Sequence, residues 1–383
     1  MLPKEEFLSR IEKITPLLKE AGISTLVISG FRNFWRDFYV RYLTGYDLHG
    51  PIDLLIMPLD EEPTLLISEK SDLYRAKKVS WVEDIRYSSD FASDCNAVLK
   101  KHISKKRSIG FAGGEMMGIK GFNFIPADLY NGIRSSFPNA DFVEATDILD
   151  KVRMIKSERE KELLRNTAKI AQAGCEALFR TAGEGISERE IFSEIWYAMQ
   201  KNGAEDLHLS MTTGMPNFWI RPPTERVLEE GDLIVAEICP RVEGYFIQTI
   251  KMAVVGEVKR EYEDLFAIEK SALEAGLEQV KPGNKIKDIV NAANDIVKNS
   301  GIGTLDMGQG MIRAGHAGGI GLDESPPLTI TNELEIQEDM SLIVHPVSFF
   351  PYIGSVFFIG DHTLVKSDGA EILTTHQEQL ISV

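Results

Sequence analysis

Two histidines and a glutamate in the C-terminal half of the chain are residue types that can carry acid–base chemistry. Glu237 lies in GDLIVAEICP, His316 in RAGHAGGIGL and His345 in MSLIVHPV. Imidazole titrates near neutral pH, so one histidine of a pair can accept a proton while the other donates one. The same three side chains could instead form a two-histidine, one-carboxylate set for a single iron, manganese or zinc ion. The residue types leave both chemistries open.

Strands and helices of a second domain, residues 151–383, should position these side chains. Ser157 and Ser187 are good helix N-caps with acidic residues in the first turn, and they predict two successive helices. Two more helices are predicted at residues 261–280 and 285–301, on either side of a Pro-Gly turn. Strands are predicted before and after this pair. Helices on one side of a long curved antiparallel sheet would make an α+β arrangement.

The first 150 residues alternate helical and strand patterns. They open with an amphipathic helix, and apolar strands are predicted at residues 25–30, 53–59, 64–68 and 108–113. A helix over residues 97–103 is predicted before the last of these strands. Residues 1–150 therefore form a small α/β domain, and the domain boundary is expected near residue 150.

Composition excludes several classes of protein. The chain has 383 residues, enough for two domains, and a formal net charge of −16. Such a charge repels nucleic acid and anionic membranes, so neither partner is expected. The sequence contains no long apolar run and no signal peptide, which predicts a cytoplasmic protein. Three widely spaced cysteines favour neither a disulfide framework nor a zinc ribbon.

Several segments together resemble the pita-bread hydrolases, the family of aminopeptidase P, prolidase and creatinase. These segments are RYLTGY at residues 41–46, the helix after Ser157, GDL at 231–233, GIGL at 319–322 and SDGAEILT at 367–374. Their order and spacing carry the likeness over nearly the whole chain. The resemblance implies a creatinase-type α/β domain followed by an α+β pita-bread domain, assembled as a homodimer.

Members of that family hold two metal ions with two aspartates, a histidine and two glutamates, and the metals activate a bound water. The aspartate positions fall here on Glu237 and Gln248, and the glutamate positions on His345 and Gly360. The histidine position falls on Gly318. His316 lies two residues earlier, and a small loop insertion could restore the match. Because Gln248 is neutral and Gly360 has no side chain, the resemblance implies that the dinuclear metal site is lost.

Creatinase is a metal-free member of the family that hydrolyses a C–N bond, and it is the precedent for our functional hypothesis. We predict a metal-independent hydrolase or lyase of a small amino-acid derivative or short peptide, without a cofactor. Glu237, His316 and His345 are the predicted catalytic residues, and Gln248 would bind substrate. Two alternatives stay open: an Xaa-Pro peptidase-like enzyme with one divalent metal on the same three catalytic residues, or a non-catalytic binding protein.

Further substrate-binding candidates come from the rim of the expected site and from the N-terminal domain. Arg221 could bind a carboxylate or form only a surface ion pair, and Trp219 could wall a ligand or pack in the core. His208 is a candidate with a structural alternative, and Asp361 adjoins a lost glutamate position. In dimeric members the N-terminal domain reaches the partner's site. On that basis His49 and Asp47 are candidates, and Arg32, Trp35 and Arg36 are alternatives from the preceding segment. His102, His362 and His376 are predicted to be solvated or at strand ends, with His362 the candidate exception.

Overall fold

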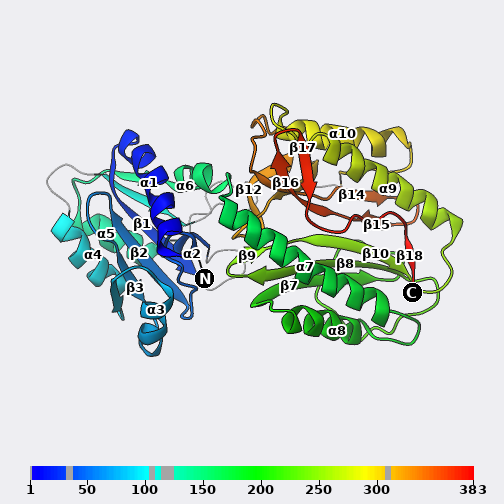
Figure 1. Ribbon diagram of the computed structural model, residues 1–383, viewed down its shortest axis with the longest axis horizontal. Coiled ribbons are helices and arrows are strands. Elements are labelled where there is room, and N and C mark those ends of the chain that lie inside the picture. The colour runs from blue at the N-terminus through cyan, green and yellow to red at the C-terminus, as the bar shows by residue number, and fades with distance from the viewer. Residues whose placement is uncertain (1, 32–37, 103–107, 114–124, 307–311) are drawn as a thin grey trace. The chain divides into compact units, whose positions relative to one another are not determined.

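The chain folds as two compact units, Met1–Arg153 and Met154–Val383. The structure is a computed structural model, and it describes residues 2–31, 38–102, 108–113, 125–306 and 312–383 (Figure 1). Within these ranges no helix is both long enough and apolar enough to cross a membrane.

The first unit is built on a six-stranded mixed sheet in the order β4-β3-β2-β1-β5-β6. Apolar residues of α4 and α5 pack with those of the central strands to form its core. The opening helix, the four predicted strands and the helix predicted before the last of them, now α4, are confirmed, whereas the other elements of this unit were not predicted. The elements are α1 (Lys4–Glu20), β1 (Ile23–Phe31), α2 (Phe38–Thr44), β2 (Ile52–Pro58), β3 (Thr64–Ile67), the 3-10 helix η1 (Lys70–Asp72), α3 (Leu73–Val79), β4 (Asp84–Tyr87), α4 (Phe91–His102), β5 (Ser108–Ala112), α5 (Ala127–Ser136), β6 (Phe142–Glu144) and α6 (Thr146–Arg153).

Two capped helices open the second unit, α7 (Glu158–Thr181) and α8 (Glu188–Lys201). Ser157 and Ser187 each accept a hydrogen bond from the backbone of a glutamate in the first turn, and that glutamate accepts one in return. These capping boxes satisfy N–H groups that the helix itself cannot pair, so both predicted helix starts are confirmed. Gly174 lets α7 lie close to the sheet, because a Cβ there would come within 3.0 Å of Ile238.

The strands of the second unit form two five-stranded sheets and a hairpin. One sheet has the order β18-β10-β8-β7 with β9 beside β8, the other β12-β11-β13-β16-β17, and β14 pairs with β15. The bounds are β7 (Asp206–Thr213), β8 (Leu233–Val242), β9 (Tyr245–Phe246), β10 (Thr249–Val254), β11 (Arg313–Ala317), β12 (Glu324–Thr329), β13 (Ser341–Val344), β14 (Val347–Phe350), β15 (Ser355–Phe358), β16 (Asp361–Lys366), β17 (Gly369–Ile372) and β18 (Ile381–Ser382). The expected single antiparallel sheet is thus wrong in detail, since it is divided and the β10–β18 pair is parallel.

Helices cover each sheet of this unit. Residues of α7 and α8 pack in one apolar cluster with β7 and β8, and residues of α9 (Arg260–Glu278) and α10 (Ile286–Asn299) pack in another with β10, β11 and β13 (Figure 1). An isolated bridge between Ile250 and Gly360 joins β10 of the first sheet to the start of β16 in the second. This bridge joins the sheet that carries Glu237 on β8 to the sheet that carries His316 on β11 and His345 after β13.

Candidate functional site

Strand register aligns Glu237, Ile250, Gly360 and His345 across neighbouring strands. Glu237 on β8 pairs with Ile250 on β10, and Ile250 forms the bridge to Gly360. His345 follows the end of β13 beside Gly360, where an added Cβ would lie 2.5 Å from the His345 Cβ. Directly opposed residues point to the same face of a sheet. The fold therefore presents Glu237 and His345 on one face. Ile234, Ala236 and Ile238 point to the opposite face, where they pack with α7 and α8.

Glu237 is held by two neighbours on its own sheet. Gln248 Nε2 donates to Glu237 Oε1 at 2.5 Å, and His208 Nε2 lies 3.3 Å from Glu237 Oε2. His208 also contacts the Ser210 hydroxyl at 3.2 Å, and a quarter of its side chain is exposed. Gln248 is almost fully buried, and its Oε1 has no hydrogen-bond partner. A buried acceptor of this kind is costly unless a ligand or water satisfies it.

His316 is engaged in a buried ion pair. Its Nε2 lies 3.0 Å from Asp323 Oδ1 and its Nδ1 lies 2.9 Å from the Ala317 carbonyl oxygen. Both partners are hydrogen-bond acceptors, so each ring nitrogen of His316 faces an acceptor. Burial acts to raise the pKa of Asp323, but His316 and Arg313 together hold it well below its ordinary value. Asp323 is therefore a carboxylate, and it was not among the predicted site residues.

His345 differs from the other site residues because neither of its ring nitrogens has a protein partner. Its ring packs edge to face against His316, with centroids 5.0 Å apart, and against Phe358 at 5.3 Å. Only 7% of the residue is exposed. Burial, and then the charges of His316 and Arg313, hold the pKa of His345 well below 6.5, while Asp323 opposes this shift. A neutral imidazole is left with one free donor and one free acceptor.

His362 occupies the space beside Gly318, the position that matches the family histidine. A Cβ at Gly318 would lie 2.8 Å from the His362 Cε1. The Gln248 N–H donates to His362 Nδ1 at 3.3 Å, so the ring proton sits on Nε2 and is directed at the Ser341 hydroxyl 2.7 Å away. Burial, then the charges of His316 and Lys156, lower the pKa of His362 to about 3. His362 is thus a buried neutral residue. It was the candidate exception among the histidines predicted to be solvated or at strand ends, and it is buried.

A dinuclear metal site does not fit the residues at these positions. Gln248 is a neutral amide already bonded to Glu237, and a side chain at Gly360 would collide with His345 and Ile250. A single metal on Glu237, His316 and His345 fits poorly as well. Both nitrogens of His316 and both oxygens of Glu237 already contact other residues, which leaves His345 alone with a free ligand atom.

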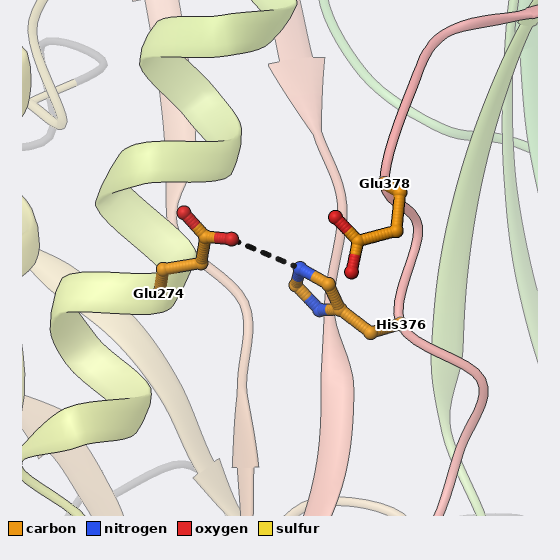
Figure 2. A group of neighbouring side chains, drawn as sticks. All are labelled: Glu274, His376 and Glu378. Atoms are coloured by element: carbon orange, nitrogen blue, oxygen red, sulfur yellow. Dashed lines mark ion pairs between the residues drawn. The ribbon is translucent and has the colours of Figure 1, made fainter.

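A different cluster of metal-ligand type lies on the second unit. Across the described residues, Glu274, His376 and Glu378 are the group whose ligand atoms gather within 4.8 Å of one another (Figure 2). His376 Nε2 lies 3.6 Å from Glu274 Oε1. Lys270 Nζ already neutralises the cluster, at 2.7 Å from Glu378 and 3.4 Å from Glu274. We therefore interpret these residues as a surface ion-pair network.

Asp361 lies on the opposite face of β16 from Gly360 and His362. Alternation along the strand turns its side chain away from His345. There it accepts hydrogen bonds from Thr374 Oγ1 at 2.8 Å and His376 Nδ1 at 2.6 Å. These contacts give no support to its expected role in substrate binding. His376 was predicted to be solvated or at a strand end, and it lies partly exposed in the segment after β17.

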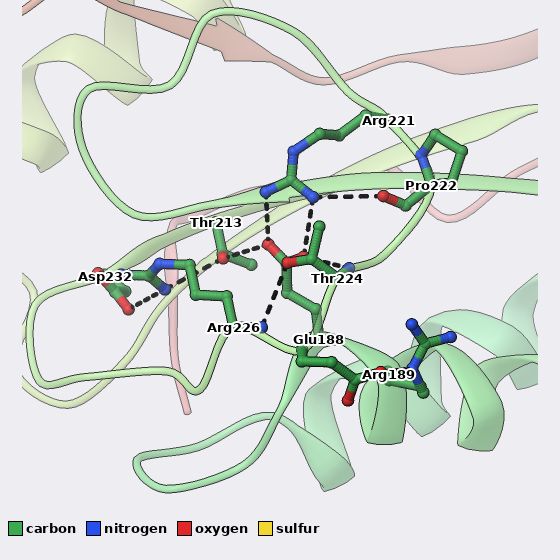
Figure 3. Close-up of polar contacts among 9 residues, drawn as sticks. Glu188, Arg189, Thr213, Arg221, Pro222, Thr224, Arg226 and Asp232 are labelled. Atoms are coloured by element: carbon green, nitrogen blue, oxygen red, sulfur yellow. Dashed lines mark hydrogen bonds and ion pairs between the residues drawn. The ribbon is translucent and has the colours of Figure 1, made fainter.

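Arg221 is held by a buried carboxylate. Its guanidinium donates to both oxygens of Glu188, at 2.9 and 3.0 Å, and the Thr213 and Thr224 hydroxyls each donate to the same carboxylate at 2.7 Å (Figure 3). Burial acts to raise the pKa of Glu188, but these donors lower it to about 2. Arg226 forms a second ion pair beside them, with Asp232. The role of Arg221 in binding a substrate carboxylate stays a prediction.

The remaining candidates each have different contacts. Trp219 is half exposed and stacks on Phe358, with centroids 6.1 Å apart, so an aromatic row runs from the surface to His345. His49 is exposed on the first unit, and Asp47 forms an ion pair with Arg75 at 2.5 Å. Arg32, Trp35 and Arg36 lie outside the described residues.

The geometry agrees with what comparison to known proteins shows. Residues 162–367 match metallopeptidase family M24, and residues 10–155 match the creatinase/prolidase N-terminal domain. The Xaa-Pro dipeptidase of Pyrococcus furiosus is 25% identical over 70% of this chain and 76% of its own length. The creatinase of a Bacillus species is 24% identical over 91% of this chain and 84% of its own.

A solved structure shows the same fold over almost all of the chain. The X-Pro aminopeptidase of Thermotoga maritima superposes with a TM-score of 0.82 and 22% identity, covering 97% of this chain and 99% of that one. The two-domain architecture is thus that of the creatinase, prolidase and aminopeptidase P proteins. With a family match over more than half of its length, this chain belongs to metallopeptidase family M24, a hydrolase family of the creatinase and Xaa-Pro peptidase type.

Proposed function

We propose that the protein hydrolyses a C–N bond of a small amino-acid derivative or short peptide without a metal ion. The observation that carries this proposal is His345, a buried neutral imidazole with both nitrogens unpartnered. The buried Oε1 of Gln248 also lacks a hydrogen-bond partner. Buried polar atoms are normally satisfied, so these orphaned atoms support a ligand site. The resemblance to creatinase sets the reaction type.

In this mechanism His345 moves the proton that hydrolysis requires. Its free acceptor nitrogen takes a proton from water as the water oxygen bonds to the substrate carbon. The imidazolium then gives that proton to the departing nitrogen as the C–N bond breaks, so the atoms and charges balance. Because its pKa is lowered, His345 is neutral before reaction and, once protonated, a strong acid toward the leaving group.

Neighbouring residues bind and stabilise charge. Asp323 opposes the lowering of the His345 pKa, so its carboxylate stabilises the transient imidazolium. His316 holds Asp323 in place. Glu237 keeps the Gln248 amide oriented with its oxygen available to a substrate N–H. His208 supports Glu237 from the more exposed side.

The proposal also covers the outer part of the site and the assembly. Trp219 offers an exposed aromatic surface that continues inward through Phe358 to His345. An apolar or cationic group of the substrate could pack there. We retain the homodimer and a contribution of His49 to the partner's site as predictions drawn from the family resemblance.

A ligand screen followed by kinetics tests this proposal. Amides, ureas, guanidines and dipeptides are screened by thermal shift, since a ligand that binds the native state raises its stability. Compounds that bind are then assayed for turnover with wild type and with His345→Ala. We expect a loss of kcat on the order of 100-fold or more in the folded variant. Turnover unchanged by the substitution would remove His345 from catalysis, and binding without any turnover would indicate a non-catalytic binding protein.

A further inference from the structure

A fully buried carboxyl group lies in the core of the second unit, outside the cluster described above. Glu269 on α9 exposes none of its surface. Its Oε2 accepts a hydrogen bond from the Ser348 hydroxyl at 2.5 Å, and its Oε1 accepts one from the Ile359 N–H at 3.3 Å. Burying a carboxyl among apolar side chains is costly even when it is hydrogen-bonded. Core packing alone would be served by an apolar residue, so the position calls for another explanation.

Both contacts of Glu269 fall on the two segments that place His345. Ser348 belongs to β14, the strand that follows His345 after Pro346. Ile359 lies between Phe358, whose ring packs on His345, and Gly360, whose backbone lies against the His345 Cβ. The strands β14 and β15 pair with each other, Val347 opposite Phe358. One carboxyl group is thus hydrogen-bonded to both chain segments that lie against His345, at Ser348 and at Ile359.

The His345 ring needs this backbone control because no hydrogen bond orients it. Both nitrogens lack protein partners, and the ring contacts His316 and Phe358 edge to face. The direction of the nitrogens is then set by the course of the backbone and by the position of Phe358. Most active-site histidines are oriented by a hydrogen bond to one ring nitrogen. The His345 ring is instead oriented by the position of its main chain.

We propose that Glu269 is a positioning residue for His345, acting through its hydrogen bonds to Ser348 and Ile359. The consequence for catalysis rests on the proposed function, but the structural effect does not. Replacing Glu269 with alanine removes its hydrogen bonds to β14 and to the segment before Gly360, leaves only the backbone pairing of β14 with β15 to hold them, and lets the His345 ring reorient. Glutamine keeps both connections, since its carbonyl oxygen accepts from the Ile359 N–H and its amide donates to the Ser348 oxygen.

Imidazole resonances test the structural effect directly. Protein labelled with 15N in its histidines is recorded as wild type, Glu269→Ala, Glu269→Gln and Ser348→Ala, and His345 is assigned from its loss in His345→Gln. We expect the His345 signals to shift in Glu269→Ala, to shift less in Ser348→Ala, and to return to the wild-type position in Glu269→Gln. Leu277→Ala, a truncation of a buried residue two turns further along α9, serves as the control for a general loss of packing.

The outcomes separate this inference from the proposed function. His345 signals that stay at the wild-type position in both Glu269→Ala and Ser348→Ala would overturn it, as would equal shifts in Leu277→Ala. Should Glu269→Ala fail to fold, Ser348→Ala and the Glu269→Gln comparison decide. With a substrate in hand, Glu269→Ala should lower kcat on the order of 100-fold with a smaller change in KM. Absence of any turnover would contradict the proposed function and leave the resonance test intact.

Discussion

Replacing Glu269 with glutamine should flatten the dependence of stability on pH. Burial, opposed by the bonds from Ser348 and Ile359, raises the pKa of Glu269 from 4.5 to about 8. Between these values the unfolded chain has lost a proton that the folded protein keeps, so the free energy of unfolding falls as pH rises. The stabilisation is complete below pH 4.5 and is lost as pH rises through about 8. At 1.36 kcal/mol per pH unit, the loss between pH 5 and pH 8 is on the order of 3 kcal/mol.

Guanidinium denaturation followed by tryptophan fluorescence measures this effect. Wild type and Glu269→Gln are unfolded at several values between pH 5 and pH 8, and the difference in their unfolding free energies is plotted against pH. We expect that difference to move in favour of the glutamine variant by on the order of 3 kcal/mol across the range. Glu278→Gln, an exposed position on the same helix, is the matched control. Parallel curves for wild type and Glu269→Gln would refute the reasoning, because Glu269 would then ionise as an ordinary carboxyl.

Two further predictions concern residues beside the site. Gly360→Ala should lower the free energy of unfolding by about 1–3 kcal/mol, because the new methyl group would overlap His345. Gly183→Ala, where an added Cβ meets nothing within 4 Å, is its control, and equal stabilities in denaturant would contradict the prediction. Asp361→Asn should lower the pKa of His376, because the hydrogen bond that the His376 ring donates to the Asp361 carboxylate raises it. An NMR titration of the His376 ring measures this pKa, and an unchanged midpoint would show that Asp361 does not raise it.

Local signals in the sequence predicted much of the fold. The helix starts at Ser157 and Ser187 follow from capping residues within one turn, so they are readable without tertiary contacts. The division of the expected sheet could not be predicted in this way. The two sheets meet through contacts between residues far apart in sequence, such as the isolated bridge of Ile250 with Gly360, and the last strand pairs in parallel with β10.

The site was predictable where the spacing across one hairpin decides a position. Glu237 and Gln248 face each other as the hairpin spacing implies. Asp323 was missed, although a carboxylate soon after His316 in the glycine-rich segment was a signal that could have indicated it. Asp361 was expected at the site from its adjacency to Gly360, but neighbours on a strand face opposite ways. His362 fills the space beside Gly318, and no pattern in the sequence reports that packing.

Turnover by metal-stripped protein tests the central claim most directly. A substrate from the ligand screen is assayed with enzyme treated with chelator and with the same enzyme after addition of manganese, zinc or cobalt. The donor set around His345 predicts equal kcat values in all samples, because Gln248, Gly360 and the engaged His316 cannot hold the family's metal pair. Activity that disappears with chelator and returns with metal would contradict the account.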